Sequence, residues 1–325
     1  MDLMNTGGFF PRVKNISIRI IISSIFILWV PSAAVPADSA QMKNGSNKIE
    51  IIATFFPVYL FTRNITEGIS AIKVDLLLPA TYGCPHDFSL LPEDIKKIGQ
   101  ADIIVQNGMG MENFLTPAMA SANSHPKLIL ATENITPIKL KYEENHQTVP
   151  AELYNPHAFA SPPEAALMIE AIADRLIEYL PAYTEKLKAN KERYRAKIDS
   201  LSQLFKVSLV NLKNDKIVTV HEVFDYMARA YHFEIADVIE KEPGQEPSAK
   251  EMMELAANIR QKQVAGLFSE PQYSSKIVKV LAQELDLPIY ELDPVASGPV
   301  NPPADYYEQV MGRNLATLIL AFKGR

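Results

Sequence analysis

The stretch that decides the fold is an apolar run followed by a turn, VDLLLP at 74–79 and TYGCPHDF at 81–88. The apolar run predicts a buried β-strand that stops at Pro79, and the residues from Leu91 onward have the spacing of a helix. A strand, a tight turn and a helix in this order are typical of an open α/β sheet, which binds ligands at the carboxyl ends of its strands. His86 lies in this turn, so the pattern places an imidazole at such a position.

Strands and helices alternate on both sides of this stretch. In the first half, further apolar runs predict strands that begin near residues 51, 101 and 128, with helical segments between them. The second half repeats the alternation and closes with a helix at 306–322, and its strands are expected at 216–220, 233–238, 264–269 and 288–292. Ser248 and Glu251 predict a capping box at the start of one of its helices. We therefore expect an α/β protein of two similar lobes, each a mostly parallel sheet flanked by helices.

The longest helical pattern in the chain connects the two halves. It covers roughly 182–212, and its apolar stripe lies among Lys, Arg and Glu side chains: Leu187, Tyr194, Ile198, Leu201, Leu204 and Phe205. At about 1.5 Å per residue such a helix is on the order of 45 Å long, which is enough to run along both lobes. We interpret it as one long rigid helix that joins the lobes, because the stripe is too short and irregular for a coiled coil.

The first forty residues differ in character from the rest. Three basic residues precede the apolar run IIISSIFILWV at 20–30, and small residues follow it as far as Ala37. This is the pattern of a secretory signal peptide, and the run is short for a membrane span. The expected organisation is a signal peptide at 1–37, a linker at 38–48, a first lobe at 49–180, a connecting helix at 181–212 and a second lobe at 213–325.

Composition and charge narrow the choice of partners. The net charge of −6 and the lack of a Lys/Arg cluster argue against a nucleic acid partner. No second long apolar run follows the signal peptide, so we expect a soluble mature protein. Cys84 is the only cysteine and has no internal disulfide partner. We expect it to be a packed thiol, with metal ligation as the alternative.

Three of the six His residues suggest metal chemistry. His86, His157 and His221 occupy turns or strand ends rather than helix faces, and Asp293 follows an expected strand in the same way. No local metal-binding motif joins these residues, so a site exists only where the fold brings them together. From the residues alone, a metal site and ordinary surface or core imidazoles both remain open.

A family resemblance rests on seven motifs that occur in the same order along the chain. They are GCPHDF at 83–88, ADI at 101–103 with NGMGME at 107–112, NPH at 155–157, VHEVFDY at 220–226, EPS at 246–248, EPQ at 270–272 and LDP at 292–294. Together they resemble the metal-binding class of ABC-importer solute-binding proteins, the zinc- and manganese-uptake family (ZnuA/TroA-like), over nearly all of residues 51–322.

The resemblance implies four metal ligands, His86 and His157 in the first lobe and His221 and Asp293 in the second. Three imidazoles and one carboxylate suit a borderline ion such as Zn²⁺, and a His at position 221 favours zinc over Mn²⁺ or Fe²⁺. The resemblance also implies a monomeric periplasmic carrier that captures Zn²⁺ in a cleft between its lobes and delivers it to an ABC permease of the inner membrane. Such a carrier is not an enzyme.

Other functions remain as alternatives to this interpretation. The first is a manganese or iron carrier of the same family. A secreted zinc hydrolase and a metal-free adhesin are more remote, because a hydrolase needs a metal-bound water with a nearby general base and an adhesin leaves the three His unexplained.

The neighbours of the expected ligands carry their own expectations. Many zinc members of the family have a long His-rich loop before the second ligand, whereas the segment 134–154 offers only His146, so we expect no such loop here. Asp87 and Glu222 are candidate acceptors for imidazole N–H groups, and solvated or helix-terminal charges explain them equally well. Glu270 is a third candidate acceptor, but it lies between an expected strand and a proline, so we favour a buried structural role for it.

Overall fold

The computed structural model describes residues 48–85, 88–140, 153–212, 215–240, 247–272 and 276–323. The expected signal peptide at 1–37 and all but the last residue of the expected linker lie outside these residues, as do His86, Asp87 and His146. Within the part that the structure describes, no helix combines the length and the apolar character that a membrane crossing needs.

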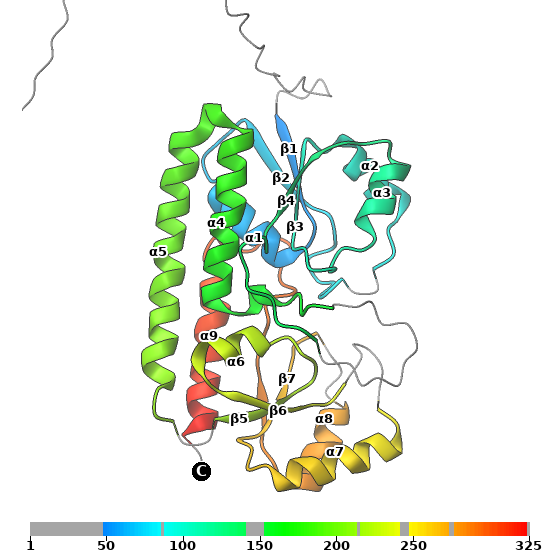
Figure 1. Ribbon diagram of the computed structural model, residues 1–325, viewed down its shortest axis with the longest axis vertical. Helices are drawn as coiled ribbons and strands as arrows, with labels where there is room; N and C mark the ends of the chain where they lie inside the picture. Colours follow the sequence, from blue (N-terminus) through cyan, green and yellow to red (C-terminus); the bar gives the residue numbers. More distant parts are fainter. Residues whose placement is uncertain are drawn as a thin grey trace, which may run out of the picture. The chain divides into compact units, whose positions relative to one another are not determined.

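The first lobe is built on a parallel sheet in the strand order β2–β1–β3–β4 (Figure 1). Its strands are β1 (Ile49–Ala53), β2 (Ile72–Leu76), β3 (Ile103–Gln106) and β4 (Lys127–Leu130), and its helices are α1 (Phe56–Ile65), α2 (Pro92–Gln100) and α3 (Leu115–Ser121). β1 is central, because Ile51 pairs with Val74 of β2 on one side and with Ile103 of β3 on the other. Helices cover this sheet, so the residues of β1 and β3 are largely apolar and buried.

The second lobe repeats this topology, with a parallel sheet in the strand order β6–β5–β7–β8. Its strands are β5 (Lys216–Thr219), β6 (Glu234–Val238), β7 (Leu267–Ser269) and β8 (Ile289–Glu291), and its helices are α6 (Asp225–Tyr231), α7 (Ala249–Gln261) and α8 (Lys276–Leu285). In both lobes the first strand of the lobe lies between the second and the third. The prediction of two similar lobes with parallel sheets is therefore confirmed.

The long helix α5 (Thr184–Leu209) packs against α4 (Pro162–Tyr179) and, nearer its other end, against α9 (Tyr306–Phe322) (Figure 1). α5 has 26 residues and follows a short 3₁₀ turn at Pro181–Tyr183. At 1.5 Å per residue it is about 39 Å long, so the predicted long connecting helix is confirmed with slightly shorter bounds. Its buried stripe matches the predicted one except at Leu204, which is 51% exposed.

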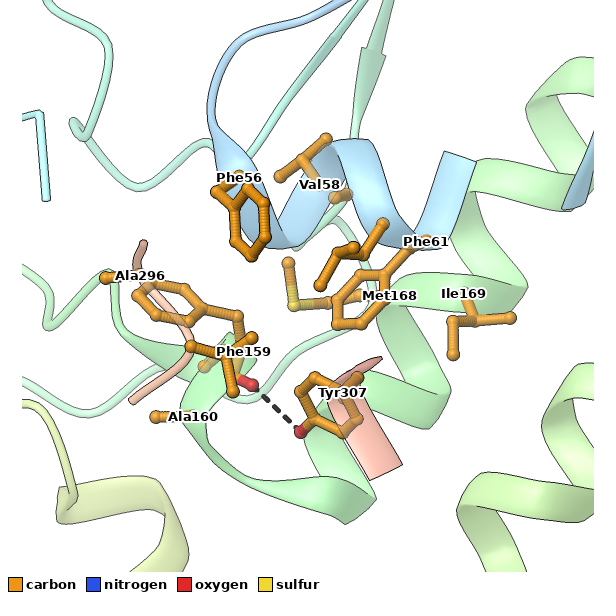
Figure 2. Packing of buried hydrophobic residues seen from close by; sticks show 14 of the residues in the cluster. Phe56, Val58, Phe61, Phe159, Ala160, Met168, Ile169, Ala296 and Tyr307 are labelled. Atoms are coloured by element: carbon orange, nitrogen blue, oxygen red, sulfur yellow. Dashed lines mark hydrogen bonds between the residues drawn. The ribbon is translucent and has the colours of Figure 1, made fainter. Parts of the chain in front are cut away.

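One hydrophobic core is continuous between the lobes. Tyr307 of α9 packs against Phe61 of α1 with a distance of 5.2 Å between ring centroids, and its hydroxyl donates a 2.9 Å hydrogen bond to the carbonyl of Phe159 (Figure 2). Phe159 in turn packs edge-on against Phe55, with a distance of 5.2 Å between ring centroids. All four rings are buried, together with Ala296 of the second lobe. Each buried aromatic side chain stabilises such a core by about 1.5–3 kcal/mol, so this packing fixes the lobes to each other.

Two elements differ from the sequence-based expectation. β2 ends at Leu76 rather than at Pro79, and it is a partly exposed edge strand rather than a buried one. The chain still follows β1 beyond the strand, because the N–H groups of Leu77 and Leu78 donate to the carbonyls of Ala53 and Thr54 at 2.9 and 3.2 Å. α3 was not expected, since its sequence LTPAMAS contains a proline and carries only a short apolar pattern.

Candidate metal centre

The carboxyl ends of neighbouring strands in the second lobe carry three acidic or imidazole side chains. His221 lies two residues beyond β5, Glu270 comes directly after β7, and Asp293 lies two residues beyond β8. β5 and β7 are adjacent, and the order of the sheet reverses between them. This reversal is the position at which open α/β sheets bind their ligands.

His157 belongs to the first lobe and is fixed by Asn155. The side-chain oxygen Oδ1 of Asn155 accepts from the backbone N–H of His157 at 2.9 Å and lies 2.8 Å from Nδ1 of its ring. The amide orientation is fixed independently, because Nδ2 of Asn155 donates to the carbonyl of Glu222 at 2.6 Å and to Asp225 Oδ2 at 2.9 Å. An amide oxygen only accepts, so Nδ1 of His157 carries the hydrogen and Nε2 carries the lone pair that a metal needs.

The motif NGMGME at 107–112 forms hydrogen bonds with the same loop. Asn107 Nδ2 donates a 2.9 Å hydrogen bond to the carbonyl of Pro156. The buried carboxylate of Glu112 accepts from the N–H groups of Asn107 and Gly108 at 2.6 and 3.0 Å and from the hydroxyl of Thr54 at 2.7 Å. Burial raises the pKa of Glu112, and these hydrogen bonds act against that rise. The loop that bears His157 therefore rests on an internal polar network of the first lobe.

His221 is fixed by Glu270 in the same manner. Nδ1 of His221 lies 2.6 Å from Glu270 Oε1, and Nε2 of Gln272 donates to Glu270 Oε2 at 2.7 Å. Burial raises the pKa of Glu270, while the neighbouring His221 lowers it. A carboxylate beside Nδ1 orients an imidazole so that Nε2 serves as the metal ligand. Glu270 is buried as expected, and its carboxylate contacts the predicted ligand His221, which fits its alternative role as an acceptor for imidazole.

The two buried imidazoles meet although they come from different lobes. The ring centroids of His157 and His221 are 5.2 Å apart, and the ring planes are inclined by 84°. The side chains of His157 and His221 are 4% and 2% exposed. Among the described residues, the ligand atoms of Cys84, His157 and His221 all lie within 4.8 Å of one another.

The other two predicted ligands are His86 and Asp293. His86 lies outside the described residues, so its ligation stays a prediction. Asp293 is not a member of the close set, and its Oδ1 accepts a 2.8 Å hydrogen bond from the N–H of Val295. The backbone of Asp293 is tied to Asn314, which accepts from its N–H at 3.0 Å and donates to its carbonyl at 2.7 Å. Burial raises the pKa of Asp293. A nearby cation would lower it.

The part of Glu222 that is seen to act at the centre is its backbone carbonyl. Its carboxylate was the group expected to accept from an imidazole. Its carbonyl accepts from Asn155, which links the two lobes directly beside the imidazoles. Burial raises the pKa of the Glu222 carboxyl to about 7, with Asp225 adding to the rise and His221 opposing it.

Two lobes that bring one oriented imidazole each to a shared buried point define a class, the two-lobed solute-binding proteins that hold a metal ion between their lobes. Comparison with protein families narrows this class. The model of the family described as "Zinc-uptake complex component A periplasmic" (ZnuA) matches residues 51–321, and this chain belongs to that family.

Curated relatives cover most of the chain at modest identity. It is 28% identical to the zinc-binding protein AdcA of Streptococcus pyogenes serotype M3 over 94% of this chain and 61% of that protein. It is 27% identical to the high-affinity zinc uptake system protein ZnuA of Bacillus subtilis over 82% of this chain and 84% of that protein. The chain thus spans less than two thirds of the length of AdcA.

A solved structure shows the same fold. The solute-binding protein FpvC of Pseudomonas aeruginosa, determined in complex with Mn²⁺, superposes with a TM-score of 0.76 at 27% identity. The match covers 85% of this chain and 99% of that one.

Proposed function

We propose that this protein is a periplasmic solute-binding protein that captures Zn²⁺ between its lobes and delivers it to an ABC permease of the inner membrane. The observation that carries the proposal is the meeting of His157 and His221, each oriented by an acceptor at Nδ1. The description of the family as part of a zinc-uptake complex supports the role in transport. The zinc-binding names of the relatives AdcA and ZnuA support the choice of metal.

The proposed ligands are His86, His157, His221 and Asp293, and the motif positions of His86 and Asp293 support their inclusion. Four protein ligands leave no coordination position for a substrate water, so the ion is carried and nothing is transformed. Residues 1–37 serve as the signal peptide, and the mature monomer works in the periplasm.

The test is native mass spectrometry of the metal-free protein titrated with Zn²⁺ and Mn²⁺. The parent should bind one Zn²⁺, and His157→Ala and His221→Ala should each lose most of the zinc affinity. His125→Ala is the matched control, because His125 is an exposed imidazole outside the centre. Zinc binding by both site variants at the affinity of the parent would overturn the proposal.

Manganese transport is the alternative within the same family, and the similar FpvC has been determined in complex with Mn²⁺ as well as with Ni²⁺. Equilibrium dialysis against equal concentrations of both ions separates the two. If the protein retains mainly manganese, manganese rather than zinc is the transported ion. The role as a carrier would still stand.

A further inference from the structure

Cys84 lies at the same point as the two imidazoles. It follows β2 on the turn that also contains Gly83 and Pro85, so it reaches the centre from a third segment of the chain. Its Sγ lies within 4.8 Å of ligand nitrogens of both His157 and His221. The side chain is partly buried and also packs against the hydrophobic core, as the sequence predicted for a packed thiol.

The spacing of these three atoms is close to that of a metal site. Zn–N bonds of about 2.0 Å and Zn–S bonds of about 2.3 Å place the ligand atoms of a tetrahedral zinc site about 3.3–3.6 Å apart. Ligand atoms that start within 4.8 Å of one another therefore need to move by about 1 Å or slightly more to contact one ion. Side-chain rotation supplies movements of this size without any rearrangement of the lobes.

The chemistry of the three groups is also consistent. Two imidazoles and a thiolate form a set that binds Zn²⁺ strongly, whereas Mn²⁺ prefers carboxylate, carbonyl and water oxygens. Ligation forms the metal–sulfur bond and releases the thiol proton to solvent, and no atom changes its oxidation state.

We infer that Cys84 is a direct ligand of the transported metal, together with His157 and His221, and that its sulfur selects zinc against manganese. This inference rests on the proposed function, since it presupposes that the centre holds a metal ion. A tetrahedral ion has four positions, so Cys84 takes the place of one of the four proposed ligands and leaves one position beside His157 and His221.

The test uses the full mature chain loaded with Co²⁺, a coloured substitute for Zn²⁺. A thiolate bound to Co²⁺ gives a charge-transfer absorption band in the near ultraviolet, and Cys84 is the only cysteine that can produce it. We expect this band in the parent and its loss in Cys84→Ser, with Co²⁺ still bound. Loss of a side chain that only orients a ligand typically lowers metal affinity by about 10- to 100-fold. The zinc affinity of Cys84→Ser should fall by at least this factor, because a direct ligand is lost. Its manganese affinity should change far less.

X-ray absorption at the zinc edge of the loaded parent needs no variant, and it should detect sulfur at about 2.3 Å from zinc. Bound metal without a sulfur neighbour and without the charge-transfer band would overturn the role of Cys84 and leave the carrier function standing. A parent that binds neither Co²⁺ nor Zn²⁺ would instead overturn the proposed function, and this inference with it.

Discussion

Gly298 lies where the second lobe touches the first. Its backbone N–H donates to the carbonyl of Ala80 at 2.8 Å, and a Cβ at this position would lie 2.3 Å from Cζ of Phe56. Such a contact is far below any van der Waals distance, so even a methyl group forces the ring or the backbone to move.

Gly298→Ala should therefore lower the free energy of unfolding by about 1–3 kcal/mol, the usual cost of overpacking. Gly312→Ala is the matched control, because a Cβ there meets nothing within 4 Å and the position lies inside α9. The control should raise the free energy of unfolding by about 0.5–1 kcal/mol. Urea unfolding followed by circular dichroism measures both, and equal effects of the two variants would contradict the packing described here.

Glu270 offers a second test at the level of single residues. Glu270→Gln keeps the shape of the side chain and removes the charge that faces Nδ1 of His221. Zinc affinity should fall by about 10- to 100-fold, as is typical when an outer-shell carboxylate is lost. Competition with a chelator of known affinity provides the measurement.

Glu254→Gln is the control for this variant, because Glu254 is an exposed carboxylate on α7. It should bind zinc like the parent. An unchanged zinc affinity in Glu270→Gln would mean that the contact between Glu270 and His221 is structural only.

The sequence identified the imidazoles of the centre and named Glu270 as one of three candidate acceptors, but it did not show which imidazole Glu270 contacts. His157 and His221 stand out because histidine is scarce and both lie beside turns or strand ends. The role of Glu270 depends on β5 and β7 being adjacent, and His221 and Glu270, which are 49 residues apart in the sequence, give no local sign of their contact. Cys84 was assigned to packing for the same reason, since its distance from the imidazoles is set by the fold alone.

At the scale of elements, the sequence predicts a helix or its first turn correctly where neighbouring residues alone determine the structure. The capping box of α7 is present, with the N–H of Ser248 donating to Glu251 at 2.8 Å and the N–H of Glu251 donating to the hydroxyl of Ser248 at 3.3 Å. α9 was predicted with its observed bounds. The exposure of β2 was missed because the strand was expected in the apolar run that begins at Val74, whereas the observed strand, IKVDL at 72–76, carries the charged residues Lys73 and Asp75.

α9 also carries a partly buried acid, which leads to a prediction on pH. Neither carboxylate oxygen of Glu308 has a hydrogen-bond partner among the described residues, and Lys197 Nζ lies 3.9 Å from Oε1. Burial raises the pKa of Glu308 above its ordinary value of 4.5. An acid whose pKa is higher in the folded state favours folding at low pH, and this contribution is lost as the pH rises through the folded-state pKa.

Glu308→Gln removes this titration. The parent should therefore lose stability relative to Glu308→Gln as the pH rises from about 4.5 towards neutrality. The quantity compared is the free energy of unfolding of the two proteins. Denaturant unfolding at several pH values measures the difference. Glu192→Gln on the exposed side of α5 is the control, and a pH-independent difference for Glu308→Gln would refute the assignment.

At the scale of the whole molecule, zinc bound by residues of both lobes should stabilise the folded protein. A ligand that binds only the folded state adds stability that grows with its concentration, about 2.7 kcal/mol at a free concentration of 100 Kd. We expect zinc to raise the unfolding temperature of the parent and a chelator to reverse the shift. His221→Ala should lose most of this increase, since it removes the second lobe's imidazole. An equal increase in His221→Ala would place the ion elsewhere.

The position of α9 has a consequence for how the protein is made. The helix is synthesised after both sheets, yet Tyr307 completes the packing around Phe61 and Phe159, which belong to the first half of the chain. The amino-terminal half therefore lacks part of its core until residue 307 has been synthesised. A fragment that stops before residue 306 should be digested throughout by a protease, without a resistant amino-terminal core.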